Sequence, residues 1–84
     1  MERTFDYAQT RDHAVEALRQ RFPNAAITAE EGWHGRVHIK IVSPEFDNLT
    51  GRQSQDAVWD VLKERLREEA QGISLVLTLG MDEL

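Results

Sequence analysis

The sequence predicts an α+β protein with a single small domain, in which two helices cover one face of a three-stranded mixed sheet. Two segments carry apolar residues at helical spacing, and two others alternate as strands do. A length of 84 residues suits one domain. The predicted order of elements is α-β-β-α-β, and the domain takes in residues 1–84.

The first predicted helix begins at Thr10, which can cap it, and continues to about Arg21. Pro23 ends the helix, because proline disfavours helical geometry in the residue before it. A weak strand follows at Ala25–Thr28. The expected apolar stripe of the helix is narrow and consists of Ala14, Leu18 and either Phe22 or Arg21.

The second strand, Val37–Val42, is the best defined. Its apolar residues share one face by the period of two, and His38 and Lys40 lie on the other face. Residues 30–35, which precede it, contain two glycines and predict a loop. Ser43 and Pro44 end the strand, and Phe46 is expected to anchor the following loop in the core.

The second helix has a clear start signal. Thr50 and Gln53 have the spacing of a capping box, with Ser54 as the alternative cap. The helix is predicted to continue to about Ala70, and Gly72 is predicted to end it. Its expected buried stripe consists of Ala57, Val58, Val61, Leu62 and Leu66.

The third strand, Ile73–Leu79, completes a β-α-β unit with Val37–Val42 and the helix between them. The two strands of such a unit are parallel. The short first strand is expected to form an antiparallel hairpin with the second. The helices then cover one face of the sheet, and the opposite face is expected to be largely solvated.

Composition limits the classes of function. Ten Lys and Arg against fifteen Asp and Glu give a net charge of −5, which disfavours direct nucleic-acid binding, since phosphate neutralisation needs concentrated positive charge. The chain has no cysteine, so it has no disulfide framework and no thiolate metal site. No apolar run approaches the roughly 18 residues of a membrane span. Residues 1–15 lack the apolar core of a signal peptide, and a cytoplasmic location is expected.

Histidines are the candidate metal ligands. His34 and His38 have the H-x3-H spacing that binds zinc on a helix, but a loop and a strand would separate them by about 13 Å at roughly 3.3 Å per residue. A metal shared by these two alone is therefore disfavoured. His34 is the better single ligand, and otherwise it is an exposed loop histidine. No nucleophile elbow or phosphate-binding glycine motif is present, so no enzymatic activity is predicted.

Trp33, in the same glycine-bounded loop, allows two interpretations. It packs against the sheet edge, or it is exposed as a binding anchor, since tryptophan is enriched at interface hot spots. Basic residues that could form a small patch are Arg36, Lys40 and Arg52.

One stretch resembles a known family. The run Ile41-Val42-Ser43-Pro44, Phe46 two positions on, and the polar helix start Gln53–Gln55 are similar to the BolA-like family, as are Val58 and Leu62 in the helix. The resemblance is gapless from residue 37 to residue 62 and implies the α-β-β-α-β arrangement that is compared with class II KH folds. It also implies a non-enzymatic adaptor or regulatory protein in iron–sulfur or stress physiology, which contacts a monothiol glutaredoxin.

The resemblance further implies where an iron–sulfur cluster shared with a glutaredoxin would be held. Family members carry a ligand histidine at the helix start, and the matching position here is Gln55, a poor ligand for cluster iron. The chain thus resembles a divergent member that lacks the helix-start histidine. The other family ligand comes from the loop between the first two strands, where His34 is the nearest candidate.

The leading hypothesis is a BolA-like adaptor whose contact surface combines residues 30–36 with the helix start at residues 50–56. A KH-like nucleic-acid-binding module is an alternative, although the chain has no GxxG loop between helices, as KH domains have. A small structural protein of unknown function that self-associates through a sheet edge or face is another, and the chain is expected to be a monomer or a homodimer. The candidate binding residues are Trp33, His34, Arg36, Arg52 and Gln55, with His34 as the candidate metal ligand.

Overall fold

The predicted α-β-β-α-β order is confirmed. The computed structural model describes residues 5–83, so the outermost parts of the expected domain, residues 1–4 and 84, lie outside the described residues. Short 3-10 turns join several of the elements. The helices and strands are α1 (Tyr7–Arg21), β1 (Ala26–Glu31), β2 (Val37–Val42), α2 (Gly51–Leu66) and β3 (Ile73–Leu79).

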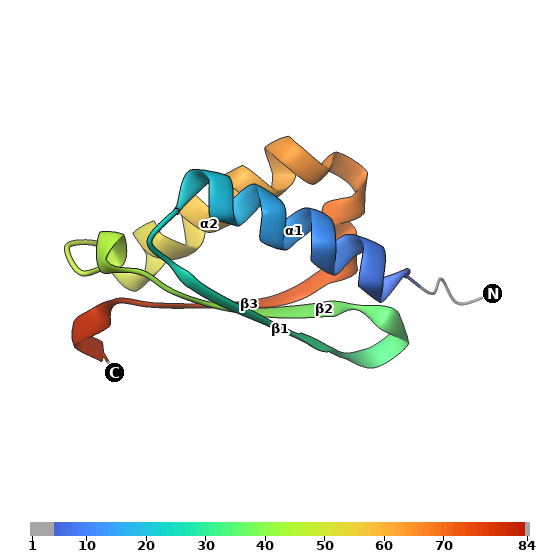
Figure 1. The fold of residues 1–84 in the computed structure, drawn as a ribbon, viewed down its shortest axis with the longest axis horizontal. Coiled ribbons are helices and arrows are strands. Elements are labelled where there is room, and N and C mark those ends of the chain that lie inside the picture. The colour runs from blue at the N-terminus through green and yellow to red at the C-terminus, as the bar shows by residue number, and fades with distance from the viewer. Residues whose placement is uncertain (1–4, 84) are drawn as a thin grey trace.

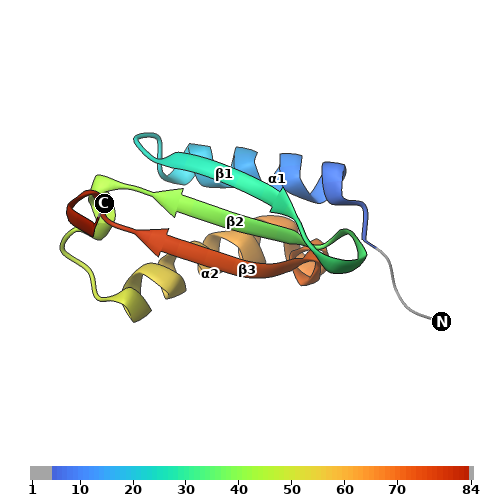
Figure 2. The ribbon, with the colours of Figure 1, turned by 90° about the horizontal axis from the view of Figure 1, so that it is seen from below.

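The sheet has the order β1-β2-β3 and is mixed, as expected. β1 and β2 pair antiparallel, and β2 and β3 pair parallel. Both helices lie over one face of the sheet (Figure 1), while the view from below shows the three strands without a covering element (Figure 2). Within residues 5–83, no helix is long and apolar enough to cross a membrane.

The core lies between the helices and the sheet, where burial of apolar surface stabilises the fold by about 25 cal/mol per Å². Phe46 is fully buried, and its ring meets that of Phe22 edge-on with centroids 5.4 Å apart. The expected anchoring role of Phe46 is therefore confirmed. The apolar stripes predicted for both helices supply Ala14, Leu18, Phe22, Val58, Leu62 and Leu66, and β2 supplies Val37, Ile39 and Ile41.

The start predicted for the first helix is wrong. α1 begins at Tyr7, because the Asp6 side chain accepts a hydrogen bond from Gln9 N at 3.1 Å and serves as the N-cap. Thr10 lies inside the helix and is buried. Aspartate and threonine are both favourable N-cap residues. Here Asp6 is the cap, and the Thr10 side chain is instead buried inside the fold.

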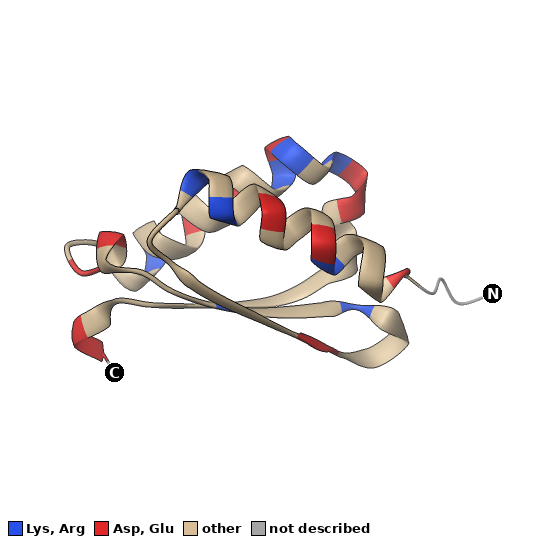
Figure 3. Ribbon diagram, viewed as in Figure 1, with Lys and Arg blue, Asp and Glu red and all other residues tan. Residues whose placement is uncertain are grey.

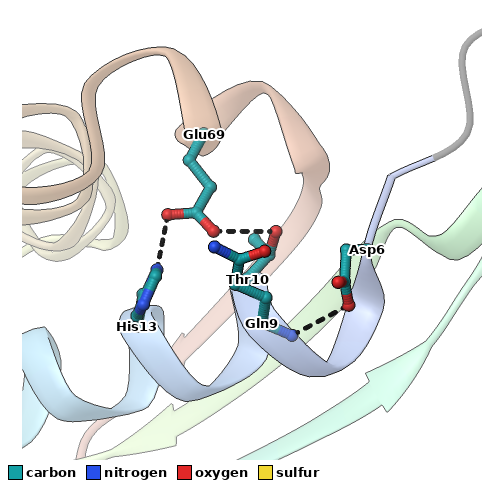
Figure 4. A network of polar contacts seen from close by, with 5 residues as sticks. All are labelled: Asp6, Gln9, Thr10, His13 and Glu69. Carbon is teal, nitrogen blue, oxygen red and sulfur yellow. Dashed lines mark hydrogen bonds and ion pairs between the residues drawn. The ribbon is translucent and has the colours of Figure 1, made fainter.

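Thr10 takes part in a polar network that joins α1 to the turn after α2 (Figure 4). Its Oγ1 donates to Glu69 Oε2 at 3.3 Å, while His13 Nδ1 lies 2.7 Å from Glu69 Oε1. One carboxylate therefore contacts two successive turns of α1, which fixes the position of residues 67–72 against the first helix.

The capping box at the start of α2 is confirmed, since Gln53 N donates to Thr50 Oγ1 at 3.1 Å and Thr50 N donates to Gln53 Oε1 at 2.9 Å. The predicted end of the helix is wrong. α2 stops at Leu66, and Arg67 has a positive φ of 55°, after which a 3-10 segment leads to Gly72. Arginine favours helices, so its own propensity does not mark this stop. The turn allows Ala70 to be buried.

β1 starts one residue later and ends three residues later than the expected Ala25–Thr28. Its added residues pair with β2, Glu30 opposite His38 and Glu31 opposite Val37. Pairing with the strong strand β2 therefore extends β1 through two glutamates of low strand propensity.

Because of an irregularity in the pairing of β2 and β3, the side chains of β3 after this point lie on the opposite faces from those that regular pairing would give. Val37 pairs with Ile73, but the next residue, His38, pairs with Leu75, so one residue of β3 is extra at this point. Because successive strand residues point to opposite faces, one extra residue turns all later side chains over. Ile73 and Val76 are therefore buried, while Leu75 and Leu77 face solvent.

Candidate functional site

The most exposed large apolar side chain among the described residues is Trp33, at 79%. It lies in the connection between β1 and β2. Within this connection, we define residues 33–36 as the tip. The interpretation that Trp33 packs against the sheet edge is therefore wrong, and its role as a binding anchor stays a prediction. The Trp33 and His34 rings stand edge-on with centroids 5.0 Å apart, and His34 is half-buried.

Backbone hydrogen bonds hold the tip in one conformation. Gly32 N donates to Arg36 O at 2.7 Å, and Arg36 N donates to Trp33 O at 3.1 Å. Phe5 N donates to His34 O at 2.9 Å, and the Arg36 guanidinium lies 5.5 Å from the centre of the Phe5 ring. The exposed indole of Trp33 therefore belongs to a turn that backbone hydrogen bonds hold in place.

Two residues of the tip have positive φ. Histidine tolerates the left-handed region better than most residues, and His34 has φ 57° and ψ 32°. Gly35 has φ 76°, and a Cβ at this position would overlap Phe5 O. Gly35 is therefore required both by conformation and by the close approach of the chain before α1.

The other two candidate binding residues, Arg52 and Gln55, belong to the first turns of α2. The Arg52 side chain is 92% exposed and approaches Asp56 at 4.0 Å, a pair that at such exposure adds little stability. Gln55 instead makes contacts within the fold. Its Nε2 donates to Val76 O at 2.6 Å, and its Oε1 accepts from Trp59 Nε1 at 3.2 Å.

The structure does not bring these two groups of residues together. The tip lies just before the first residue of β2, whereas α2 starts beyond the last residue of β2. The tip and the helix start are thus found at opposite ends of the sheet (Figure 2). The six residues of β2 span about 20 Å at roughly 3.3 Å each. The single contact surface expected from residues 30–36 and 50–56 is therefore not formed.

The basic residues are also dispersed. Arg36 is at the tip, Lys40 is in the middle of β2, and Arg52 is at the start of α2. The ribbon in Figure 3 shows Lys and Arg positions interspersed with Asp and Glu positions along both helices. Arg36, Lys40 and Arg52 do not meet in one patch.

Metal ligands do not cluster. Residues 5–83 contain no group of three or more His, Cys, Asp or Glu side chains that could hold a metal ion. His38 lies on the uncovered sheet face, where a Cβ on Gly32 would overlap its imidazole, while the His34 ring stands edge-on to that of Trp33. His34 stays a prediction as a single ligand that a partner protein would have to complement.

The sequence predicts an open sheet face but does not reveal that Leu75 and Leu77 lie on it. We define the open sheet face as Thr28, Glu30, His38, Lys40, Leu75 and Leu77. These side chains line a shallow hollow of about 220 Å³, in which Leu75 and Leu77 are 52% and 47% exposed. Register places Glu30, His38 and Leu75 in one row and Thr28, Lys40 and Leu77 in the next. The alternation of residues in the sequence does not show that the two leucines are on the open face, because it does not reveal the extra residue at the start of β3.

Two carboxyl groups have displaced pKa values. A hydrogen bond between the side chains of Asp47 and Asp82 lowers the pKa of Asp47 and raises that of Asp82. Both residues belong to exposed turns, where Asp82 N also donates to Asp47 Oδ1 at 3.3 Å. The pair joins the turn after β2 to the turn after β3.

No protein-family model matches the chain, and the search of curated proteins found no match. The fold implied by the BolA-like resemblance, a small α-β-β-α-β domain with a three-stranded mixed sheet, is nevertheless the fold observed.

Proposed function

We propose that this protein is a non-enzymatic, BolA-like adaptor that binds a protein partner through its tip. The observation that carries the proposal is the exposure of Trp33, at 79%, on a turn braced by backbone hydrogen bonds. Tryptophan is enriched at interface hot spots, and a preorganised anchor loses little conformational entropy on binding. The half-buried His34 beside it supplies an imidazole at the same surface.

A monothiol glutaredoxin is the partner class that the resemblance implies. In this proposal His34 is the ligand that this chain offers to a shared iron–sulfur cluster. Gln55 has no such role, because its amide is engaged with Val76 and Trp59 at a distance from the tip. The partner and glutathione would therefore supply the remaining ligands.

The direct test mixes the purified protein with a monothiol glutaredoxin, iron, sulfide and glutathione. We expect a visible cluster absorption and a complex that elutes earlier on size exclusion. Trp33→Ala should weaken the complex, and His34→Ala should alter the cluster spectrum. Arg52→Ala is the matched control at the opposite end of the sheet and should change neither. Unchanged elution without a cluster spectrum removes the glutaredoxin-type partner, and binding that survives both tip variants moves the contact away from the tip.

Self-association through the open sheet face is the second candidate function. It is favoured by the adjacent, half-exposed Leu75 and Leu77 at the edge of a sheet face that no helix covers. Light scattering over a range of concentrations tests it. A dimer that dissociates in Leu77→Lys supports this function, whereas a monomer at every concentration rules it out.

A further inference from the structure

β1 is an edge strand whose outward backbone groups can be identified. The hydrogen bond from Gly32 N to Arg36 O, at 2.7 Å, continues the β1–β2 ladder by one position. Bonded and non-bonded pairs alternate in an antiparallel ladder, so Thr28 and Glu30 direct their backbone groups to β2. The residues whose N–H and C=O groups point to the free edge are therefore Ile27, Ala29 and Glu31.

The opposite edge of the sheet is partly covered. Ser43 N donates to Leu79 O at 3.0 Å, so the C=O group of Leu79 points to β2 and that of Val76 points outward. Gln55 Nε2 occupies this outward Val76 oxygen. Because α2 blunts the edge of β3 in this way, β1 is the better edge for adding a strand.

A groove of about 440 Å³ lies between α1 and this free edge of β1. Its apolar lining consists of Val15 from α1 and Ile27 and Ala29 from β1, all of them half-buried. The side chains of Ile27 and Ala29 thus line the groove, while their backbone N–H and C=O groups point to the free edge of β1. The charged residues around the lining are Arg11, Asp12, Glu16 and Arg19.

We propose that the groove between α1 and β1 binds an extended segment of another protein, which adds to β1 as a fourth strand. Main-chain hydrogen bonds to Ile27 and Ala29 would supply affinity, and alternate side chains of the segment would meet Val15. The lining suits small β-branched apolar side chains. The stretch from Arg11 to Arg19 measures about 12 Å at 1.5 Å per helical residue, which is about four residues of a strand.

A second copy of this chain fits the groove less well than a foreign segment. Along α1, Val15 lies midway between Arg11 and Arg19, so a two-fold axis at the groove centre would set Arg11 beside Arg19 of the second copy. At each end of the interface two arginines would then compete for the carboxylate of Asp12, which already pairs with Arg11 at 2.9 Å. The net charge of −5 on each copy adds to the repulsion.

A random heptapeptide phage library, panned against the full chain, tests the proposal. We expect enriched peptides with β-branched apolar residues at alternate positions. Synthesised versions, added to ¹⁵N-labelled protein, should slow amide hydrogen exchange at Ile27, Ala29 and Glu31. The amides of Thr28 and Glu30, already directed to β2, should change little. This alternate-residue pattern separates strand addition from a nonspecific contact.

Two variants make the test decisive. Val15→Glu places a charge in the groove lining and should weaken peptide binding at least about tenfold, since an unpaired charge is costly against apolar surface. Ala29→Pro removes one outward N–H at an edge position where proline is tolerated, and it should abolish binding. Thr28→Val, on the open sheet face, is the matched control and should bind normally. Circular dichroism checks that each variant is folded.

Three results would overturn the proposal. The first is equal enrichment of peptides on the protein and on Val15→Glu. The second is a selected peptide that shifts the resonances of Trp33 or Leu77 in place of those of β1. The third is a protein dimer that Ala29→Pro converts to a monomer, which would assign the edge to a second copy.

Discussion

Gln55 Nε2 donates a 2.6 Å hydrogen bond to the backbone oxygen of Val76, and this bond joins the first turns of α2 to the outer edge of β3. Trp59, one helical turn further on, donates from Nε1 to Gln55 Oε1 and orients the amide. The amide of Gln55 is thus used to satisfy a backbone acceptor at the edge of the sheet.

Replacing Gln55 should therefore destabilise the fold. We expect Gln55→Ala to lower the free energy of unfolding by about 1 kcal/mol, the typical net value of an intramolecular hydrogen bond. Urea denaturation followed by tryptophan fluorescence and by circular dichroism measures the change. Gln9→Ala, at an exposed position of α1, is the control. Equal stability of the two variants would show that the Gln55 bond contributes nothing.

Gln55→His tests whether one substitution can create a cluster site together with His34. We expect no cluster held jointly by this histidine and His34, because the side chain at position 55 lies against Val76 in the middle of β3, whereas His34 lies in the turn before β2. Absorption spectra after reconstitution with iron and sulfide, without a partner, measure this. A cluster that forms in Gln55→His and disappears in the double variant with His34→Ala would contradict the expectation.

The N-cap of α1 is a third testable feature. Asp6→Ala should lower the free energy of unfolding by about 1 kcal/mol, because it leaves the Gln9 N–H without its side-chain acceptor. Asp6→Asn retains an acceptor oxygen and should cost much less. Thermal unfolding of the two variants decides the matter, and similar losses in both would point to a role of Asp6 other than capping.

Glu69 should matter more than its exposed neighbour Glu68. Its carboxylate contacts Thr10 and His13 at once, so Glu69→Ala should cost about 1–2 kcal/mol of unfolding free energy. Glu68→Ala should change stability by less than about 0.5 kcal/mol, as is usual for surface substitutions. Parallel urea titrations provide the comparison, and equal costs would remove the proposed link between α1 and the turn after α2.

The carboxyl pair predicts a definite order of titration. The shared hydrogen bond lowers the pKa of Asp47 and raises that of Asp82, so Asp47 should lose its proton at the lower pH. Asp47→Asn removes the negative partner, and the pKa of Asp82 should fall toward the ordinary range near 3.9. Carboxyl ¹³C NMR titration follows both groups. Asp6→Asn, in the turn before α1, should leave Asp82 unchanged.

Much of the fold is predictable because local signals and packing agree. The alternation in Val37–Val42, the capping box of Thr50 and Gln53, and the apolar stripes all correspond to observed elements. The ends of elements are less predictable, because tertiary contacts set them. Arg67 ends α2 against its own helix propensity, and β1 is lengthened by its pairing with β2.

The candidate site is less predictable than the fold. Residues 30–36 and 50–56 are close enough in the sequence to suggest one surface, but the direction of β2 carries them to opposite ends of the domain. The groove beside β1 leaves no sequence signature either, since it depends on which backbone groups of an edge strand remain outside the ladder.

The extra residue at the start of β3 has a consequence for recognising relatives of this chain. Leu75 and Leu77 are exposed and Val76 is buried only because β3 contains the extra residue. The number of residues between Gly72 and these positions therefore decides which side chains of β3 are buried. A homologue that is one residue shorter at this point could have the same apolar residues in β3, but the leucines would then be buried and the residue at the position of Val76 would be exposed. Length in this segment should therefore distinguish chains that share the leucine surface better than percentage identity does.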